Sequence, residues 1–344
     1  MINRIAIMGC GSLGTILGAF LNKAGLDVTM VDAWKEHVEA LKAHGATVTQ
    51  GVEMTVPVKA ACTPDEMEGT FDLFIYMAKQ TFNDTAIPQM VEHCHKDTII
   101  MTCQNGLPEL VVAKYWPHSQ VYGATVGWPA TFLGPGKSAL TCSPDAPMFE
   151  FHLGTLDGPV TPQVYEIQKI LQCMCPKVHI TENLMADRWS KVLINSAFSG
   201  MSTVLNGTFG DTVQPGKAAT CSIRIAREVV RVCAVSNVKL PVIFGIDFNE
   251  LTSYTTEEGE KAACERIHQT FGGNMGKASM LQDLEKGRKC EISMIDGVVA
   301  DEGRRVGVPT PYCDAVVKIV SEVEDGKRPL QNNLDAMPDL PFYI

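Results

Sequence analysis

A glycine-rich turn between two short apolar runs is the feature that most constrains this chain. Residues Arg4–Met8 are typical of a β-strand, and they lead into Gly9-Cys10-Gly11-Ser12-Leu13-Gly14, which has the pattern G-x-G-x-x-G. Residues 15–23 carry apolar side chains at helical spacing, and Asp27–Val31 forms a second apolar run that ends at Asp32. A strand, a glycine turn, a helix, a strand and a terminal acid in this order predict a dinucleotide-binding βαβ unit.

Each part of this unit has its own task. Gly9 permits the tight turn, Gly11 lets the backbone approach a pyrophosphate, and Gly14 lets the helix pack closely on the strand. The helix N-terminus offers N–H groups and a partial positive charge to the phosphates. We therefore expect cofactor contacts from the whole turn, which consists of Gly9, Cys10, Gly11, Ser12, Leu13 and Gly14. A plain βαβ turn without a ligand is the alternative interpretation.

The acid at the end of the second strand bears on the choice of cofactor. Asp32 can accept hydrogen bonds from both hydroxyls of an adenosine ribose. A ribose 2′-phosphate beside this carboxylate would meet like-charge repulsion on the order of a few kcal/mol at about 4 Å. The sequence therefore favours NAD(H) over NADP(H), although Lys35 lies close enough in sequence to weaken the repulsion.

Composition limits the classes of partner. The chain has 344 residues, which suggests two domains, and its net charge of −10 argues against nucleic acid or an anionic membrane as a partner. No apolar run is long enough to span a bilayer and the first strand follows Met1 closely, so we expect a cytoplasmic protein.

The 12 cysteines include no C-x-x-C pair, which favours reduced core residues over disulfides. His93-Cys94-His95 is more typical of polar residues near a helix end, so no metal site is expected.

The order of predicted elements divides the chain into residues 1–181 and 182–344. In the first part apolar strands alternate with helices, which predicts an α/β Rossmann domain with a doubly wound, mostly parallel sheet. In the second part helical patterns follow one another, which predicts an all-α domain. Residues 131–147 are rich in Gly, Pro and Ser and are predicted to be a loop. Lys79 and Asn105 follow two predicted strands, at the sheet edge where such folds bind ligands.

Two polar clusters in the helical part could carry chemistry. Lys191 and Asn195 are four residues apart on a largely apolar helix, so they share one helix face. This face lines a cavity, or, in the alternative interpretation, Lys191 lies at the start of the helix and extends its ammonium group into the solvent. In the second cluster Ser279 could donate a hydrogen bond to a carboxylate, and Glu291 could pair with a buried lysine. An ordinary place on a helix surface is the alternative for Ser279 and Glu291.

Taken together, these motifs resemble the ketopantoate reductases (2-dehydropantoate 2-reductases). Besides the glycine turn and Lys79, the matching residues are Gln104-Asn105-Gly106, Trp189-Ser190-Lys191 with Asn195, and Ser279-Met280-Leu281-Gln282-Asp283 followed by Glu291-Ile292 and Gly297. The resemblance implies a Rossmann domain followed by a helical domain and a small 2-keto acid as substrate. It also admits NADP(H) as the cofactor, and a homodimer is a possible assembly.

The resemblance implies a role for each matched residue. Lys191 is the catalytic lysine that polarises the keto oxygen and supplies the proton, and Glu291 is the acid that works beside it. Asn105 lies between cofactor and substrate, and Lys79 contacts the cofactor. The implied substrate contacts come from Asn105, Lys191, Asn195, Ser199 and Ser279.

Several positions depart from the family pattern. The substrate-side differences are Ser199, Gly276, Ser293 and Asp296, three of which stand where the family usually has asparagine. After the second strand, where members that use NADP(H) often carry a basic residue, this chain has Asp32-Ala33. The catalytic residues are retained, so ketopantoate is the first candidate substrate and another 2-keto acid is the alternative. A non-catalytic dinucleotide sensor is disfavoured, because a sensor needs no proton donor.

Replacing Asp32 by alanine tests the cofactor preference. We expect Asp32→Ala to weaken NADH binding, because the ribose loses its acceptor, and to narrow the gap in affinity between NADH and NADPH. Titration of both cofactors against wild type and variant measures this gap. A wild-type protein that already prefers NADPH would contradict the prediction.

Overall fold

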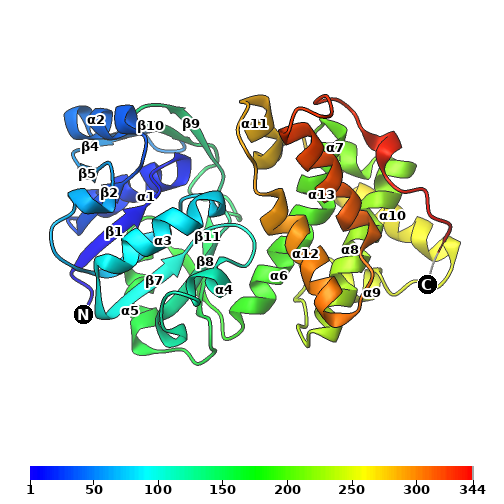
Figure 1. The fold of residues 1–344 in the computed structure, drawn as a ribbon, viewed down its shortest axis with the longest axis horizontal. Coiled ribbons are helices and arrows are strands. Elements are labelled where there is room, and N and C mark those ends of the chain that lie inside the picture. Colours follow the sequence, from blue (N-terminus) through cyan, green and yellow to red (C-terminus); the bar gives the residue numbers. More distant parts are fainter. Residues whose placement is uncertain (343–344) are drawn as a thin grey trace. The chain divides into compact units, whose positions relative to one another are not determined.

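The computed structural model describes residues 1–342, and its contacts divide the chain into two compact units. The first unit comprises residues 1–104 and 108–184, and the second comprises residues 105–107 and those from 185 onward. The first unit is an α/β fold and the second is helical (Figure 1), which confirms the predicted fold class.

The first unit is built on an eight-stranded sheet in the order β12-β11-β8-β7-β6-β1-β2-β5. Its strands are β1 Arg4–Met8, β2 Asp27–Val31, β5 Lys59–Ala61, β6 Phe71–Tyr76, β7 Cys94–Thr102, β8 Val121–Val126, β11 Glu150–Thr155 and β12 Lys177–Ile180. All neighbouring strands are parallel except β8 and β11. Because of that one antiparallel pair, β11 and β12 begin at the edge where the other strands end.

Helices cover both faces of this sheet, because its central strands are apolar on both sides. Ile5 and Ile7 of β1 pack in one core cluster with α1 Ser12–Lys23 and α5 Pro162–Gln172. Ala6 and Met8 point the other way and pack in a second cluster. The helices of that second cluster are α3 Asn83–Glu92 and α4 Pro108–Val112.

A second sheet packs against α1. Its strands are β4 Met54–Val56, β3 Ala46–Gln50, β10 Lys137–Leu140 and β9 Ala130–Gly134, and α2 Lys35–His44 precedes it. The predicted loop at 131–147 is therefore wrong for residues 131–140. The glycines that suggested a loop form the hairpin turn, where Gly134 and Gly136 have φ of 144° and 72°. Leu140 then enters the core of the unit, so tertiary packing decides that this stretch is a strand.

The second unit packs around the long helix α8. Its helices are α6 Leu184–Ile194, the π-helix Asn195–Gly200, α7 Met201–Leu205, α8 Lys217–Val235, α9 Phe248–Leu251, α10 Glu257–Phe271, α11 Ser279–Glu285, α12 Ile292–Val306 and α13 Pro311–Glu324. Short 3-10 turns elsewhere are Pro64–Glu66, Gln80–Phe82, His118–Gln120, Gly210–Val213 and Leu334–Ala336. The helical pattern over residues 249–270 is divided between two helices, because Asp247 caps α9 and Thr256 caps a separate α10.

Buried charges join the helices around α8. Arg224 of α8 forms a two-pronged ion pair with Glu260 of α10, at 2.7 and 2.9 Å, and donates to the hydroxyl of Tyr312 at 2.6 Å. Glu228, one turn further along α8, accepts the N–H groups of Tyr312 and Cys313 at 2.8 and 2.9 Å. Glu228 thus satisfies N–H groups in the first turn of α13, which have no partner within that helix.

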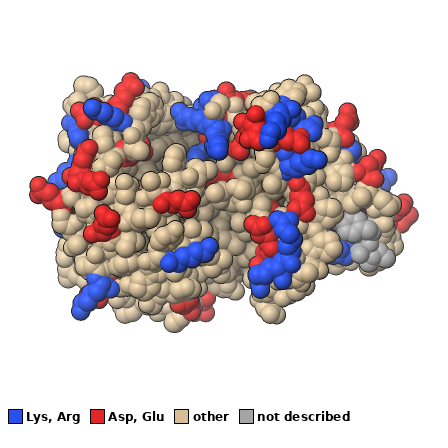
Figure 2. All heavy atoms as spheres, viewed as in Figure 1, with Lys and Arg blue, Asp and Glu red and all other residues tan. Residues whose placement is uncertain are grey.

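The surface carries charges of both signs. On the face in Figure 2, Lys and Arg side chains lie interspersed with Asp and Glu side chains, so neither sign alone dominates that face. No helix within residues 1–342 combines the length and the apolar character needed to cross a bilayer.

Candidate active site

The three glycines of the dinucleotide turn meet different surroundings. A Cβ atom at Gly9, where φ is +96°, would lie 2.1 Å from the backbone nitrogen of Ala78. A Cβ atom at Gly14 would lie 2.3 Å from the carbonyl oxygen of Gly9, whereas nothing lies within 4 Å of one at Gly11. Gly9 and Gly14 therefore allow the backbone to pack against itself. Gly11 leaves open space at the N-terminus of α1, where a phosphate can approach.

Asp32 is hydrogen-bonded to the same turn. One carboxylate oxygen accepts the N–H of Cys10 at 2.8 Å, and the other accepts the N–H of Trp34 at 2.9 Å. These bonds orient the side chain beside the turn without using all its acceptors, because each carboxylate oxygen has two lone pairs. The residues of the turn and Asp32 thus fit the phosphates and the ribose of a dinucleotide.

The carbonyl oxygen of Cys10 is held by a residue that the sequence analysis did not single out. His37, buried in α2, donates from Nε2 to this oxygen at 2.7 Å, and Thr15 Oγ1 donates to it at 2.7 Å. His37 Nδ1 accepts the N–H of Gly136 at 2.9 Å, so the ring links the glycine turn to the β9–β10 hairpin. Burial lowers the pKa of His37, so the ring is neutral near pH 7 and both bonds persist. No sequence pattern could reveal this link, because His37 and Gly136 are 99 residues apart.

A candidate site residue, Lys79, and a residue of the matched family motif, Gln104, lie where neighbouring strands of the first unit end. Lys79 directly precedes the 3-10 turn that follows β6, and it is half-buried. Gln104 follows β7 and donates from its amide to the carbonyl oxygen of Ala78 at 2.5 Å. Since β1, β6 and β7 are parallel neighbours, the glycine turn, Lys79 and Gln104 lie at one edge of the sheet.

In the second unit, Lys191, Asn195 and Ser199 lie on one continuous helical segment. Lys191 is in α6, and Asn195 begins the π-helix that contains Ser199. A π-helix has more residues per turn than an α-helix, and such turns are frequent at functional sites. Ser199 Oγ lies 3.4 Å from Asn195 Oδ1 and donates to it, so two predicted substrate contacts are neighbours in the structure.

Glu291 and Asn105 also lie together. Glu291 directly precedes α12 and is only 5% exposed, and its Oε2 accepts a hydrogen bond from Asn105 Nδ2 at 3.3 Å. Ser279 is the exposed first residue of α11. Both α11 and α12 pack against the π-helix, so elements far apart in sequence bring these candidates to one region of the second unit.

Two departures from the family pattern meet at the end of the π-helix. Asp296 of α12 is fully buried, and a Cβ atom at Gly200 would lie 2.7 Å from its Oδ2. Burial raises the pKa of Asp296 well above its ordinary value. Ser199 directly precedes Gly200. The sequence therefore departs from the family pattern both at Ser199, a candidate substrate contact, and at Asp296, which packs against the next residue.

Comparison with known proteins identifies the family. Residues 5–149 match the family described as ketopantoate reductase PanE/ApbA, and residues 183–324 match the family's C-terminal domain. The chain belongs to the ketopantoate reductase family. It is therefore an oxidoreductase that acts on CH–OH groups with a nicotinamide cofactor.

Relatives cover nearly the whole chain. It is 27% identical over 329 residues to the 2-dehydropantoate 2-reductase of Streptococcus pyogenes serotype M3, covering 93% of this chain and 97% of that protein. The same enzyme of Lactococcus lactis subsp. lactis is 26% identical over 327 residues, with coverages of 94% and 98%. Among solved structures, D-mandelate dehydrogenase with NADH and anilino(oxo)acetate has a TM-score of 0.78 at 26% identity, covering 94% of this chain and 99% of that one.

Replacing His37 tests whether it holds the glycine turn. We expect His37→Leu to raise the dissociation constant of the nicotinamide cofactor roughly tenfold, the equivalent of about 1.4 kcal/mol for a lost hydrogen bond. His37→Gln should restore part of the affinity, because its amide can both donate and accept. Fluorescence titration measures binding, with His44→Leu, an exposed position on the same helix, as the control.

The same residue gives an expected pH dependence of stability. Its pKa is lowered on folding, so the neutral ring stabilises the protein above the unfolded pKa of about 6.5, and this contribution is lost as the pH falls. The wild-type melting temperature should therefore fall more between pH 7 and pH 5 than that of His37→Leu. Equal slopes for the two proteins would contradict this role.

Proposed function

We propose that this chain reduces the keto group of a small 2-keto acid, with 2-dehydropantoate as the first candidate and pantoate as its product. The observation that carries the proposal is the buried carboxylate of Glu291, bound to the amide of Asn105 in the unit that also contains Lys191. A buried carboxylate favours the charged form of a neighbouring ammonium. The 2-dehydropantoate 2-reductases that match nearly the whole chain support this substrate class.

The proposed roles follow from the charge that develops during reduction. The nicotinamide cofactor, when bound, supplies a hydride to the keto carbon, and negative charge then grows on the keto oxygen. The Lys191 ammonium stabilises that charge and donates a proton to the oxygen, which yields the hydroxyl group. Glu291 keeps the lysine in its charged form. Asn195, Ser199 and Ser279 offer polar side chains for the substrate carboxylate.

NAD(H) is the proposed cofactor. Asp32 lies beside the glycine turn with acceptor capacity left over, which suits a ribose with two free hydroxyls and disfavours a 2′-phosphate. The D-mandelate dehydrogenase structure contains NADH, which supports the same choice.

A different 2-keto acid is the second candidate substrate. Ser199 and Asp296 change the side chain at a proposed substrate contact and the packing beneath it. The D-mandelate dehydrogenase neighbour holds anilino(oxo)acetate, a compound that joins an aromatic ring to an oxoacetate group. That neighbour thus binds an oxoacetate whose substituent differs from that of ketopantoate.

Removal of the lysine tests the proposed proton donor. Lys191→Ala should lower kcat by roughly a hundredfold to ten-thousandfold, the usual effect of losing a general acid. The dissociation constant for NADH should change little, because the variant leaves the glycine turn intact. Lys261→Ala, an exposed lysine on α10, is the matched control. Unchanged turnover in Lys191→Ala would remove this residue from the mechanism.

A turnover profile decides between the two substrates. We expect NADH oxidation with 2-keto acids and a larger kcat/KM with NADH than with NADPH. The comparison uses 2-dehydropantoate and aromatic and aliphatic 2-oxoacetates, followed at the nicotinamide absorbance. Highest kcat/KM with 2-dehydropantoate supports the first candidate, and highest kcat/KM with another acid supports the second. Tight NADH binding with no turnover of any acid would contradict both and favour a sensor.

A further inference from the structure

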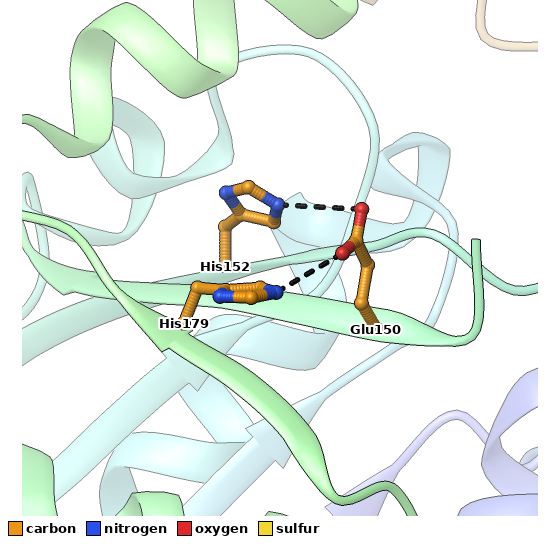
Figure 3. Close-up of side chains that lie close together, drawn as sticks. All are labelled: Glu150, His152 and His179. Carbon is orange, nitrogen blue, oxygen red and sulfur yellow. Dashed lines mark hydrogen bonds and ion pairs between the residues drawn. The ribbon is translucent and has the colours of Figure 1, made fainter. Parts of the chain in front are cut away.

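Two histidines and a glutamate converge on the first unit, away from the glycine turn. Glu150 and His152 are alternate residues of β11, so their side chains share one face of the strand. His179 of β12 is the direct register partner of His152. Figure 3 shows both imidazole rings directed at the carboxylate of Glu150. Their Nε2 atoms lie 3.5 Å (His152) and 3.1 Å (His179) from its two oxygens.

The cluster has a defined place on the main sheet. Because β11 runs antiparallel to β8, Glu150 at its start lies beside the end of β8, at the edge of the sheet that carries the glycine turn. The strands β8, β7 and β6 lie between β11 and β1. Four strand spacings of about 4.8 Å separate the two places by roughly 19 Å. The cluster is therefore distinct from the dinucleotide turn.

We propose that Glu150, His152 and His179 bind a divalent transition-metal ion, for which Zn²⁺ is the best fit. Two imidazoles and one carboxylate form a common zinc ligand set that leaves a fourth position for water. In a tetrahedral site with metal–ligand distances of about 2.0–2.1 Å, donor atoms lie about 3.3–3.5 Å apart. One donor atom from each residue lies within 4.8 Å of the other two, so small side-chain rotations suffice to form the site.

The surroundings of the cluster leave the metal position accessible. The side chains of Glu150, His152 and His179 are 31%, 38% and 53% exposed, so an ion and its water can reach them. Lys177 is the register partner of Glu150, but its ammonium donates to the carbonyl oxygen of Ala146 at 3.2 Å. Both strands are paired in the sheet, which holds the backbone of all three residues in place.

The side chains of His93-Cys94-His95 do not converge on one point. His93 Nδ1 bonds to the carbonyl oxygen of Gly69, and the sulfur of Cys94 donates to that of Met90. His95 Nε2 lies 3.0 Å from Asp72 Oδ1. These three side chains reach separate partners, whereas among residues 1–342 the group of Glu150, His152 and His179 is the one in which three potential ligands converge.

Metal binding would also strengthen the association of strand β12 with β11. β12 is an edge strand, held laterally by β11 alone. An ion shared by His179 and the two β11 residues adds a second link between these strands. Since the ion binds the folded site, saturating zinc should raise the melting temperature of the protein.

Metal titration of the full chain, freed of any affinity tag and treated with a chelator, tests the site. Calorimetry with Zn²⁺ should give one equivalent bound by the wild type. His152→Gln and His179→Gln should each weaken zinc binding at least about tenfold. Loss of a residue that only hydrogen-bonds to a metal ligand already lowers metal affinity by about this factor, and here a ligand itself is lost. Both variants should also remove the zinc-dependent rise in melting temperature. His118→Gln is the matched control, because His118 and Asp157 form an exposed pair without a third ligand.

Cobalt distinguishes this site from the cysteines of the chain. Co²⁺ bound by two imidazoles and a carboxylate lacks the thiolate charge-transfer absorption that a cysteine ligand would give. Co²⁺ spectra without that absorption, lost in His179→Gln and kept in His118→Gln, would support the site. Absence of zinc binding in the wild type, or zinc binding that is unchanged in both histidine variants, would overturn the proposal. Co²⁺ spectra that show thiolate charge-transfer absorption would overturn it as well. None of these readouts depends on catalytic activity, so the result is independent of the proposed reductase function.

Discussion

The close approach of backbone to backbone at the glycine turn is the constraint on which the nucleotide half of this protein depends. No side chain fits at Gly9 or Gly14, because the added carbon would lie within 2.4 Å of a neighbouring main-chain atom. That closeness starts α1 directly against β1 and directs its N-terminus at the sheet edge. The peptide of Cys10 is held on its N–H side by Asp32 and on its carbonyl side by His37. Asp32, the acid proposed to select NAD(H), thus also helps to hold the turn in place.

The second unit contains residues that match the family pattern and residues that depart from it. Glu291 remains buried and bound to Asn105, in the unit that contains Lys191. The changes gather around Gly200, where the small residue makes room for the buried carboxyl group of Asp296 and Ser199 lies next in the chain. The buried Asp296 has nearly the same volume as the asparagine expected from the family pattern, but it carries a carboxyl group in place of an amide. The residues proposed for the reaction are thus different from those that depart from the family pattern.

One edge of the main sheet carries two sets of polar side chains. The parallel strands end there in the glycine turn, Lys79 and Gln104, as expected for a doubly wound sheet. The single antiparallel step between β8 and β11 brings the start of β11 to the same edge. Without that reversal Glu150 would lie at the opposite edge of the sheet. A topological detail thus determines where the histidine and glutamate cluster lies relative to the nucleotide turn.

Local pattern in the sequence was sufficient for the βαβ unit, for the change from an α/β part to a helical part, and for the family. These features depend on short-range spacing and on side chains whose chemistry is specific. Only the tertiary structure decided that 131–140 forms a hairpin, because its few apolar residues become strand-forming through burial against α1. Tertiary structure also decided the contacts of His37, the position of the π-helix and the meeting of side chains on β11 and β12. Each of these depends on residues that meet across long stretches of chain, and no local pattern in the sequence encodes such a meeting.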